Sequence, residues 1–209
     1  MQFSNMLLAL VVLIFSAILH EVAHGYVADK LGDPTARLMG RLTLNPVPHI
    51  DLWMSIILPL LLIMSGSPVI FGAAKPVPVD PFNLKEGRKD VAIVSLAGPL
   101  TNILIALIAA LVIRILTPVS SLFYLMDFLR TVVTLNLLLA IFNLIPIPPL
   151  DGSKIFALIL PERDANAYLS LSSIGIFIIF FLLLFPIGGF SLGQFVFNLL
   201  TYAQNLLLP

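Results

Sequence analysis

The chain has 209 residues, of which 59% are hydrophobic and 11% are charged, and its formal net charge at pH 7 is zero. A soluble domain carries about 25% charged residues, so the composition excludes an ordinary soluble protein and predicts an all-α polytopic membrane protein. The chain has neither a cysteine nor a basic tail, which excludes disulfides and cysteine-ligated metals and argues against nucleic acid as a partner.

The first predicted membrane helix runs from residue 6 to about residue 28. It lacks the positively charged start and the cleavage site of a signal peptide, so it is expected to stay in the membrane. Near its end lies the run His20-Glu21-x-x-His24. An α-helix turns by about 100° per residue, which places these three side chains on one face. Two imidazoles one turn apart with a neighbouring carboxylate are the arrangement by which a helix binds zinc beside a general base.

Two apolar segments follow that do not match ordinary spans. Residues 52–65 are fewer than the roughly 20 that cross a bilayer, so we expect a short helix or one completed by residues 66–69. Residues 69–81 contain Pro76 and Pro78, which exclude a spanning helix. Irregular backbone at membrane depth is tolerated where protein or a water-filled cavity satisfies it. The segment is therefore predicted to be a re-entrant β strand or loop near the site, with an ordinary surface loop as the alternative.

The rest of the chain supplies further apolar helices. Three spans and a final interfacial helix or partial span are predicted at residues 91–116, 122–145, 169–185 and 191–209. With the first helix and the short one, this gives about five to six transmembrane helices in a single membrane-embedded domain, residues 1–209. Its catalytic core is expected at about residues 6–160 and its C-terminal helices at about residues 169–209.

The basic residues predict the orientation in the membrane. Three loops, at residues 29–51, 75–90 and 146–168, hold nine of the eleven Lys and Arg residues. Basic residues accumulate in cytoplasmic loops, so we expect an external N-terminus in a multi-pass protein of the cell membrane. His20 and His24 then lie toward the cytoplasmic leaflet.

A catalytic zinc takes three protein ligands and keeps one position open, so the two histidines need a third partner at the same depth. The predicted topology places Asp151 there. Residues 146–150 are rich in proline and stiffen its approach, and Gly152 permits an unusual backbone beside it. Spacing alone leaves open four other candidates, which are more simply interpreted as loop or cap residues: His49, Asp51, Asp29 and Asp33.

These residues together carry a resemblance. The His-Glu-x-x-His run in a membrane helix and the run Asn-Leu-Ile-Pro-Ile-Pro-Pro-Leu-Asp-Gly at residues 143–152 resemble the site-2 protease family of intramembrane zinc metalloproteases, peptidase family M50. Residues 97–102, whose small side chains let another helix approach closely, and residues 75–79 are also similar to family segments. The resemblance covers roughly residues 10–160.

The resemblance implies a role for each matching residue. One zinc ion per chain would be held by His20, His24 and Asp151, with Glu21 as the general base. Asn143 would hydrogen-bond the substrate or the oxyanion. The segment near the substrate path would be Lys75, Pro76, Val77 and Pro78. Many relatives also carry a PDZ domain or a pair of CBS nucleotide-binding domains, for which this chain has no room, so it resembles a minimal member.

The predicted function is the hydrolysis of peptide bonds within or near the transmembrane segments of single-span, membrane-anchored proteins, including regulatory ones. A metal transporter or channel is the first alternative, but it predicts ionisable residues at several membrane depths. A membrane metalloprotease of another class needs a downstream glutamate ligand, and Glu86 and Glu162 lack the local helix pattern. A non-enzymatic scaffold that kept the motif is the third alternative, against which the intact Glu21 argues.

Overall fold

The computed structural model describes residues 3–57, 60–61, 64–65, 74–117 and 122–209. No β-strand forms within these ranges, apart from an isolated bridge between Ile187 and Phe190. The α-helices are α1 (Phe3–Leu31), α2 (Thr35–Leu38), α4 (Arg88–Leu116), α5 (Phe123–Asn143), α6 (Asp151–Ala157), α7 (Glu162–Ser170), α8 (Ser172–Leu184) and α9 (Leu192–Leu207). Short helical turns are η1 (Val47–His49), η2 (Leu52–Ile57) and η3 (Pro81–Asn83).

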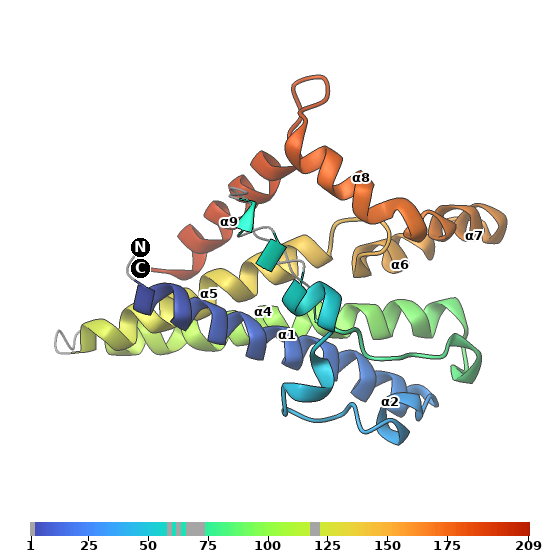
Figure 1. The fold of residues 1–209 in the computed structure, drawn as a ribbon, viewed down its shortest axis with the longest axis horizontal. Helices are drawn as coiled ribbons and strands as arrows, with labels where there is room; N and C mark the ends of the chain where they lie inside the picture. The colour runs from blue at the N-terminus through green and yellow to red at the C-terminus, as the bar shows by residue number, and fades with distance from the viewer. Residues whose placement is uncertain (1–2, 58–59, 62–63, 66–73, 118–121) are drawn as a thin grey trace.

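Among the described residues, three helices are long and apolar enough to cross a membrane, and they match the predicted first span and the spans at residues 91–116 and 122–145. They are Met6–Leu31 in α1, α4 and α5. Figure 1 shows these three helices lying side by side, with α4 in contact with both of the others. This bundle forms the body of the protein and carries the site on its helices.

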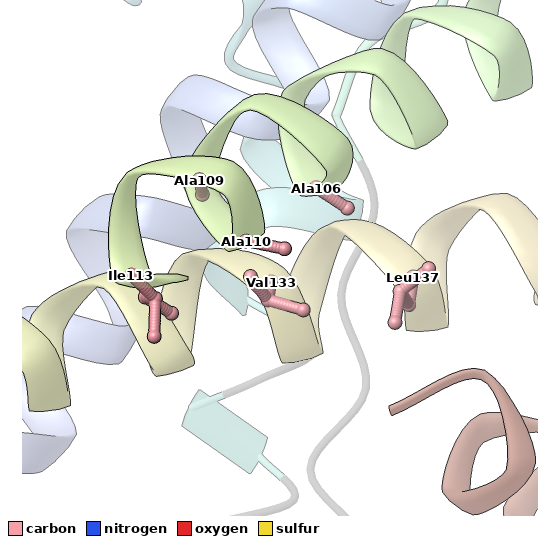
Figure 2. Close-up of a cluster of buried hydrophobic side chains, with 6 residues drawn as sticks. All are labelled: Ala106, Ala109, Ala110, Ile113, Val133 and Leu137. Carbon is pink, nitrogen blue, oxygen red and sulfur yellow. The ribbon is translucent and has the colours of Figure 1, made fainter. Parts of the chain in front are cut away.

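The contact between α4 and α5 depends on small side chains. Ala106, Ala109 and Ala110 of α4 are buried, and together with Ile113 they pack against α5. Figure 2 shows this seam, with Val133 and Leu137 of α5 opposite the alanines. Small residues allow helix backbones to approach closely in a membrane, where dispersion rather than the hydrophobic effect drives helix association.

The predicted span at residues 169–185 is broken. Helix α8 has 13 residues, which is too short to cross a membrane alone. Helices α7 and α8 are long and apolar enough only when taken together, and the pair is bent by 66°. The hydroxyls of Ser170, Ser172 and Ser173 bond to carbonyls three residues earlier, and such bonds compete with the helical ladder. The described residues therefore hold three candidate spans, or four if the bent pair counts as one, rather than an established five to six.

Parts of two predictions lie outside the described residues. Of the short segment 52–65, the structure describes a π-helical turn at Leu52–Ile57 and two short pieces of helix beyond it. Of the segment 69–81, residues 69–73 lie outside the description, and residues 74–80 form neither helix nor strand. Helix α9, at 16 residues, is shorter than a span requires and packs on α5.

Candidate metal centre

The predicted ligands converge on one point inside the bundle. His20 and His24 project from α1, and Asp151 is the first residue of α6, where a turn rich in proline ends. The Nε2 atoms of the two histidines are 3.0 Å apart. Oδ2 of Asp151 lies 3.1 Å from Nε2 of His20 and 3.2 Å from Nε2 of His24. All three side chains are buried, and their ligand atoms lie within 4.8 Å of one another.

The donor set fits a zinc ion. Nδ1 of His24 is 2.7 Å from the carbonyl oxygen of Val94, which can only accept a hydrogen bond, so Nδ1 carries a proton, and in the neutral ring that binds a metal Nε2 presents a lone pair. Nδ1 of His20 faces Oδ1 of Asn102 at 2.6 Å in the same manner. Two imidazole lone pairs and a carboxylate oxygen facing one another at about 3 Å repel unless a cation lies between them. A histidine that binds zinc through one ring nitrogen typically donates a hydrogen bond from its other ring nitrogen, and this bond orients the ring.

Gly98 makes the space for these ligands. A Cβ atom at this position would lie 2.5 Å from Nε2 of His24 and 2.6 Å from Nε2 of His20. Helix α4 therefore comes within contact distance of the ligand atoms at a point where only glycine leaves room for them. The sequence indicated close helix approach at residues 97–102, but it did not show that the neighbour of Gly98 is the metal centre itself.

Replacing Gly98 by alanine is expected to weaken zinc binding by about 10- to 100-fold, a range typical of lost support around a metal site. The added methyl group pushes the imidazole rings away from their common focus. Zinc affinity, measured by competition with a chelator, checks this result. Gly193→Ala in α9 is the matched control, because a Cβ there approaches no atom closer than 3.8 Å. Equal affinities in the two variants would show that the rings have room to spare.

Gly152 serves close packing rather than an unusual backbone. It lies inside α6, and it is not among the glycines with positive φ, so the expectation of an unusual conformation is wrong. A Cβ there would overlap the carbonyl of Leu144 and approach the carbonyl oxygen of Ile145 to 2.7 Å. Because Gly152 has no side chain, α6 can lie against the end of α5. This contact brings Asp151 to the histidines.

Glu21 lies beside the predicted ligands and contacts the extended segment 74–80. Its Oε2 atom accepts a hydrogen bond of 2.7 Å from the backbone N–H of Val77. Both residues line a cavity of about 330 Å³ beside the metal centre. The cavity is also lined by the three ligands and by Pro76, Asn143 and Lys154.

Backbone groups of the segment 74–80 are hydrogen-bonded to other parts of the chain at several points. Its Lys75 N–H donates to the carbonyl of His49 at 2.8 Å. The guanidinium of Arg41 donates to the carbonyls of Lys75 at 2.8 Å and of Pro76 at 3.3 Å. Arg41 and His49 are buried; Arg41 was not among the predicted site residues, and His49 was considered only as an alternative ligand. Sequence reasoning had no signal for these contacts, because they join loops far apart in the chain.

Asp33 anchors the far end of the same segment. It is fully buried, and its carboxylate accepts hydrogen bonds from the N–H of Asp80 at 2.7 Å and from the side chains of Thr35 and Asn83. Burial by itself raises the pKa of Asp33, but the hydrogen bonds from Thr35, Asn83 and Asp80 outweigh it and hold the pKa below its ordinary value. The ionised carboxylate therefore stabilises the fold.

A depressed pKa predicts how stability depends on pH. The contribution of Asp33 is complete above the pKa of the unfolded chain, about 3.9, and is lost as the pH falls through the lower pKa of the folded state. Asp33→Asn is expected to lower stability at pH 7 by about 1–3 kcal/mol. The difference from the wild type should shrink below about pH 4. Thermal unfolding in detergent at both pH values tests this, and a difference that does not change with pH would contradict it.

Of the other predicted site residues, some line the cavity and some do not. Asn143 lines the cavity, although its amide donates to the carbonyl of Leu139 in its own helix at 3.0 Å. Pro76 and Val77 line the cavity, whereas Lys75 and Pro78 are not part of its lining. Lys154, which was not predicted, reaches Oδ1 of Asp151 at 3.3 Å.

The four alternative ligands lie elsewhere and have other partners. Asp29 pairs with Arg37 at 2.9 Å, and Nε2 of His49 lies 2.9 Å from the carbonyl of Thr43. Asp51 accepts from the N–H of Trp53 at 3.0 Å, in the manner of a helix cap. Among the residues that the structure describes, only Asp151 joins the two histidines in a group that could hold a metal.

Comparisons with known proteins agree with this geometry. The model of peptidase family M50 matches residues 8–127 and 119–186. The relative named "Putative zinc metalloprotease YwhC" from Bacillus subtilis is 36% identical over 87% of this chain and 82% of its own length. A second relative is named "Putative zinc metalloprotease Rip2" and comes from Mycobacterium tuberculosis strain H37Rv. It is 33% identical over 66% of this chain and 51% of its own length. No solved structure matches the chain.

Proposed function

This chain belongs to peptidase family M50 and is a zinc metalloprotease, and we propose that it cleaves peptide bonds within or near the transmembrane segments of single-span membrane proteins. One observation carries the proposal. The three convergent ligands and the Glu21 carboxylate share a cavity of about 330 Å³, and α1, which bears both histidines, is long and apolar enough to cross a membrane. Lipid and the substrate helix are thus its expected partners.

Each residue at the cavity then has a role. His20, His24 and Asp151 would hold the zinc ion, and the chemistry it would supply is Lewis-acid activation of the scissile carbonyl and of water. Glu21 accepts the proton of the attacking water and returns it to the leaving amine. The N–H of Val77, 2.7 Å from Oε2 of Glu21, fixes that carboxylate beside the site. Asn143 reaches the oxyanion after its amide turns from the carbonyl of Leu139.

The extended segment supplies a path for the substrate. A transmembrane helix hides its carbonyls in its own hydrogen bonds, so it must unwind locally before cleavage. We infer that residues 74–79 pair with the unwound segment by strand addition, as part of the predicted re-entrant segment, whose residues 69–73 lie outside the described residues. The contacts from Arg41, Asp33 and His49 support this role, because a docking edge must be held in place. Crosslinks found only far from these residues would contradict it.

The orientation proposed from the loops is an external N-terminus and a site near the cytoplasmic leaflet of the cell membrane. The five to six spans proposed from the sequence include the bent α7–α8 pair and the segments around residues 52–69. A transporter is not favoured. Among the described residues, the buried ionisable groups of α1, α4 and α5 are His20, His24 and Asp90, whereas a path across the bilayer needs such groups at several depths.

The proposed function is tested with purified protein in lipid vesicles and a panel of single-span substrates. Cleavage inside or beside the transmembrane segment is expected, together with about one zinc ion per chain. Removal of the metal by a chelator should abolish cleavage, and addition of zinc should restore it. Cleavage that persists without metal would overturn the proposal, as would cleavage confined to soluble peptides.

A further inference from the structure

Three polar side chains lie behind His20, in the interior of the bundle. Asn102 of α4 and Asn136 of α5 are both fully buried, and Ser16 of α1 is 4% exposed. Each comes from a different one of the three long apolar helices. Polar groups at membrane depth are costly and often mark functional sites, and of the three only Asn102 contacts a predicted metal ligand, at Nδ1 of His20.

The hydrogen bonds among them have a fixed direction. The carbonyl of Val132 can only accept, so Nδ2 of Asn136 faces it at 2.9 Å and also faces Oγ of Ser16 at 2.9 Å. Oδ1 of Asn136 is thereby turned toward Asn102, whose Nδ2 donates to it at 2.8 Å. Nδ2 of Asn102 also lies 3.4 Å from the carbonyl of Ser16, a second group that can only accept.

The orientation of both amides determines the state of His20. With its Nδ2 directed at Asn136 and Ser16, Asn102 must present Oδ1 to the imidazole, and Nδ1 of His20 lies 2.6 Å from that oxygen. Nδ1 must then carry the proton, which leaves a lone pair on Nε2, the atom that faces His24 and Asp151. His24 needs no such support from a side chain, since a backbone carbonyl holds its Nδ1.

We propose that Asn102 and Asn136 are positioning residues that fix the tautomer and ring orientation of His20 for zinc, an inference that rests on the proposed function. Asn102 acts on the imidazole directly. Asn136 acts through Asn102 by preventing its amide from turning over. The backbone of α5 thus determines the protonation of a ligand on α1.

The test compares Asn102→Leu and Asn136→Leu, which keep the branched shape and the number of heavy atoms of the side chain but remove the amide. Val133→Ala is the matched control, because it removes buried packing between α4 and α5 without touching the amides. Nitrogen-15 NMR of histidine-labelled, metal-free protein at pH 8 reports the tautomer of His20, whose signals are assigned by their loss in His20→Asn. Zinc affinity is measured by chelator competition in the same detergent.

In the wild type we expect His20 protonated at Nδ1, and in both leucine variants a mixture of tautomers. Zinc binding should weaken by about 10- to 100-fold, most in Asn102→Leu, and stay unchanged in Val133→Ala. Asn102→Asp should recover part of the lost affinity, because one carboxylate oxygen still accepts from Nδ1, while the other repels Oδ1 of Asn136. If Asn102→Leu does not fold, the tautomer and the zinc affinity of Asn136→Leu decide the test.

An unchanged tautomer and unchanged zinc affinity in the leucine variants would overturn the inference while leaving the protease intact. A loss of affinity as large in Val133→Ala would also overturn it, because it would reduce the effect to general packing. If the wild type bound no zinc, the proposed function would fail, and the tautomer measured without metal would still decide whether the two amides control His20.

Discussion

Substituting Glu21 by glutamine is expected to lower the cleavage rate by about 10²- to 10⁴-fold while zinc stays bound. A glutamine cannot accept and return the proton that peptide hydrolysis moves from water to the leaving amine. Its carbonyl oxygen can still accept from the N–H of Val77, which binds Oε2 of Glu21 at 2.7 Å in the wild type. The variant should therefore keep the shape of the cavity and lose the base alone.

The measurement pairs the rate of substrate cleavage in vesicles with zinc content. Glu162→Gln is the matched control, because it makes the same chemical change on an exposed residue in the first turn of α7. Full activity in the control and a loss confined to Glu21→Gln would assign the effect to the cavity. Equal cleavage by the wild type and Glu21→Gln would remove Glu21 from the mechanism, and a loss of zinc from the variant would assign it a ligand's role instead.

The convergence of His20, His24 and Asp151 could be predicted because it depends on rules that act locally. Helical spacing places the two imidazoles on one face, and loop charges place residue 151 at the same end of the bundle. The three long spans could be predicted for a similar reason, since continuous apolar length is read directly from the sequence.

The support around the ligands could not be predicted, because it depends on how helices rotate and slide against one another. Asn102 meets His20 although 82 residues separate them, and Gly98 meets the imidazoles because α4 crosses α1 at that height. The bend between α7 and α8 also escaped prediction. Hydropathy averages over residues 169–185 and does not register three serine hydroxyls that bond to the helix backbone.

Removal of Asp151, the proposed third ligand, is expected to have the second large effect. Asp151→Ala should weaken zinc binding by more than about 100-fold, beyond the 10- to 100-fold typical of lost support around a metal site, and cleavage should fall to background. Among the residues described, the variant deletes the only carboxylate that joins the two histidines in a group that could hold a metal. It also deletes the charge that faces Lys154 at 3.3 Å, so the ammonium group would add repulsion for a cation.

Zinc titration at limiting metal separates this effect from a loss of folding. Asp127→Ala is the matched control. Asp127 pairs with Arg130 at 3.7 Å on an exposed face of α5, and the two partners are three residues apart, as Asp151 and Lys154 are. Asp151→His offers a second test, since an imidazole can replace a carboxylate as a zinc ligand and should recover part of the affinity. Unchanged zinc occupancy in Asp151→Ala would mean that the two histidines bind metal with a different third partner. Glu21 would then be the first candidate for that partner, because its carboxylate lines the same cavity.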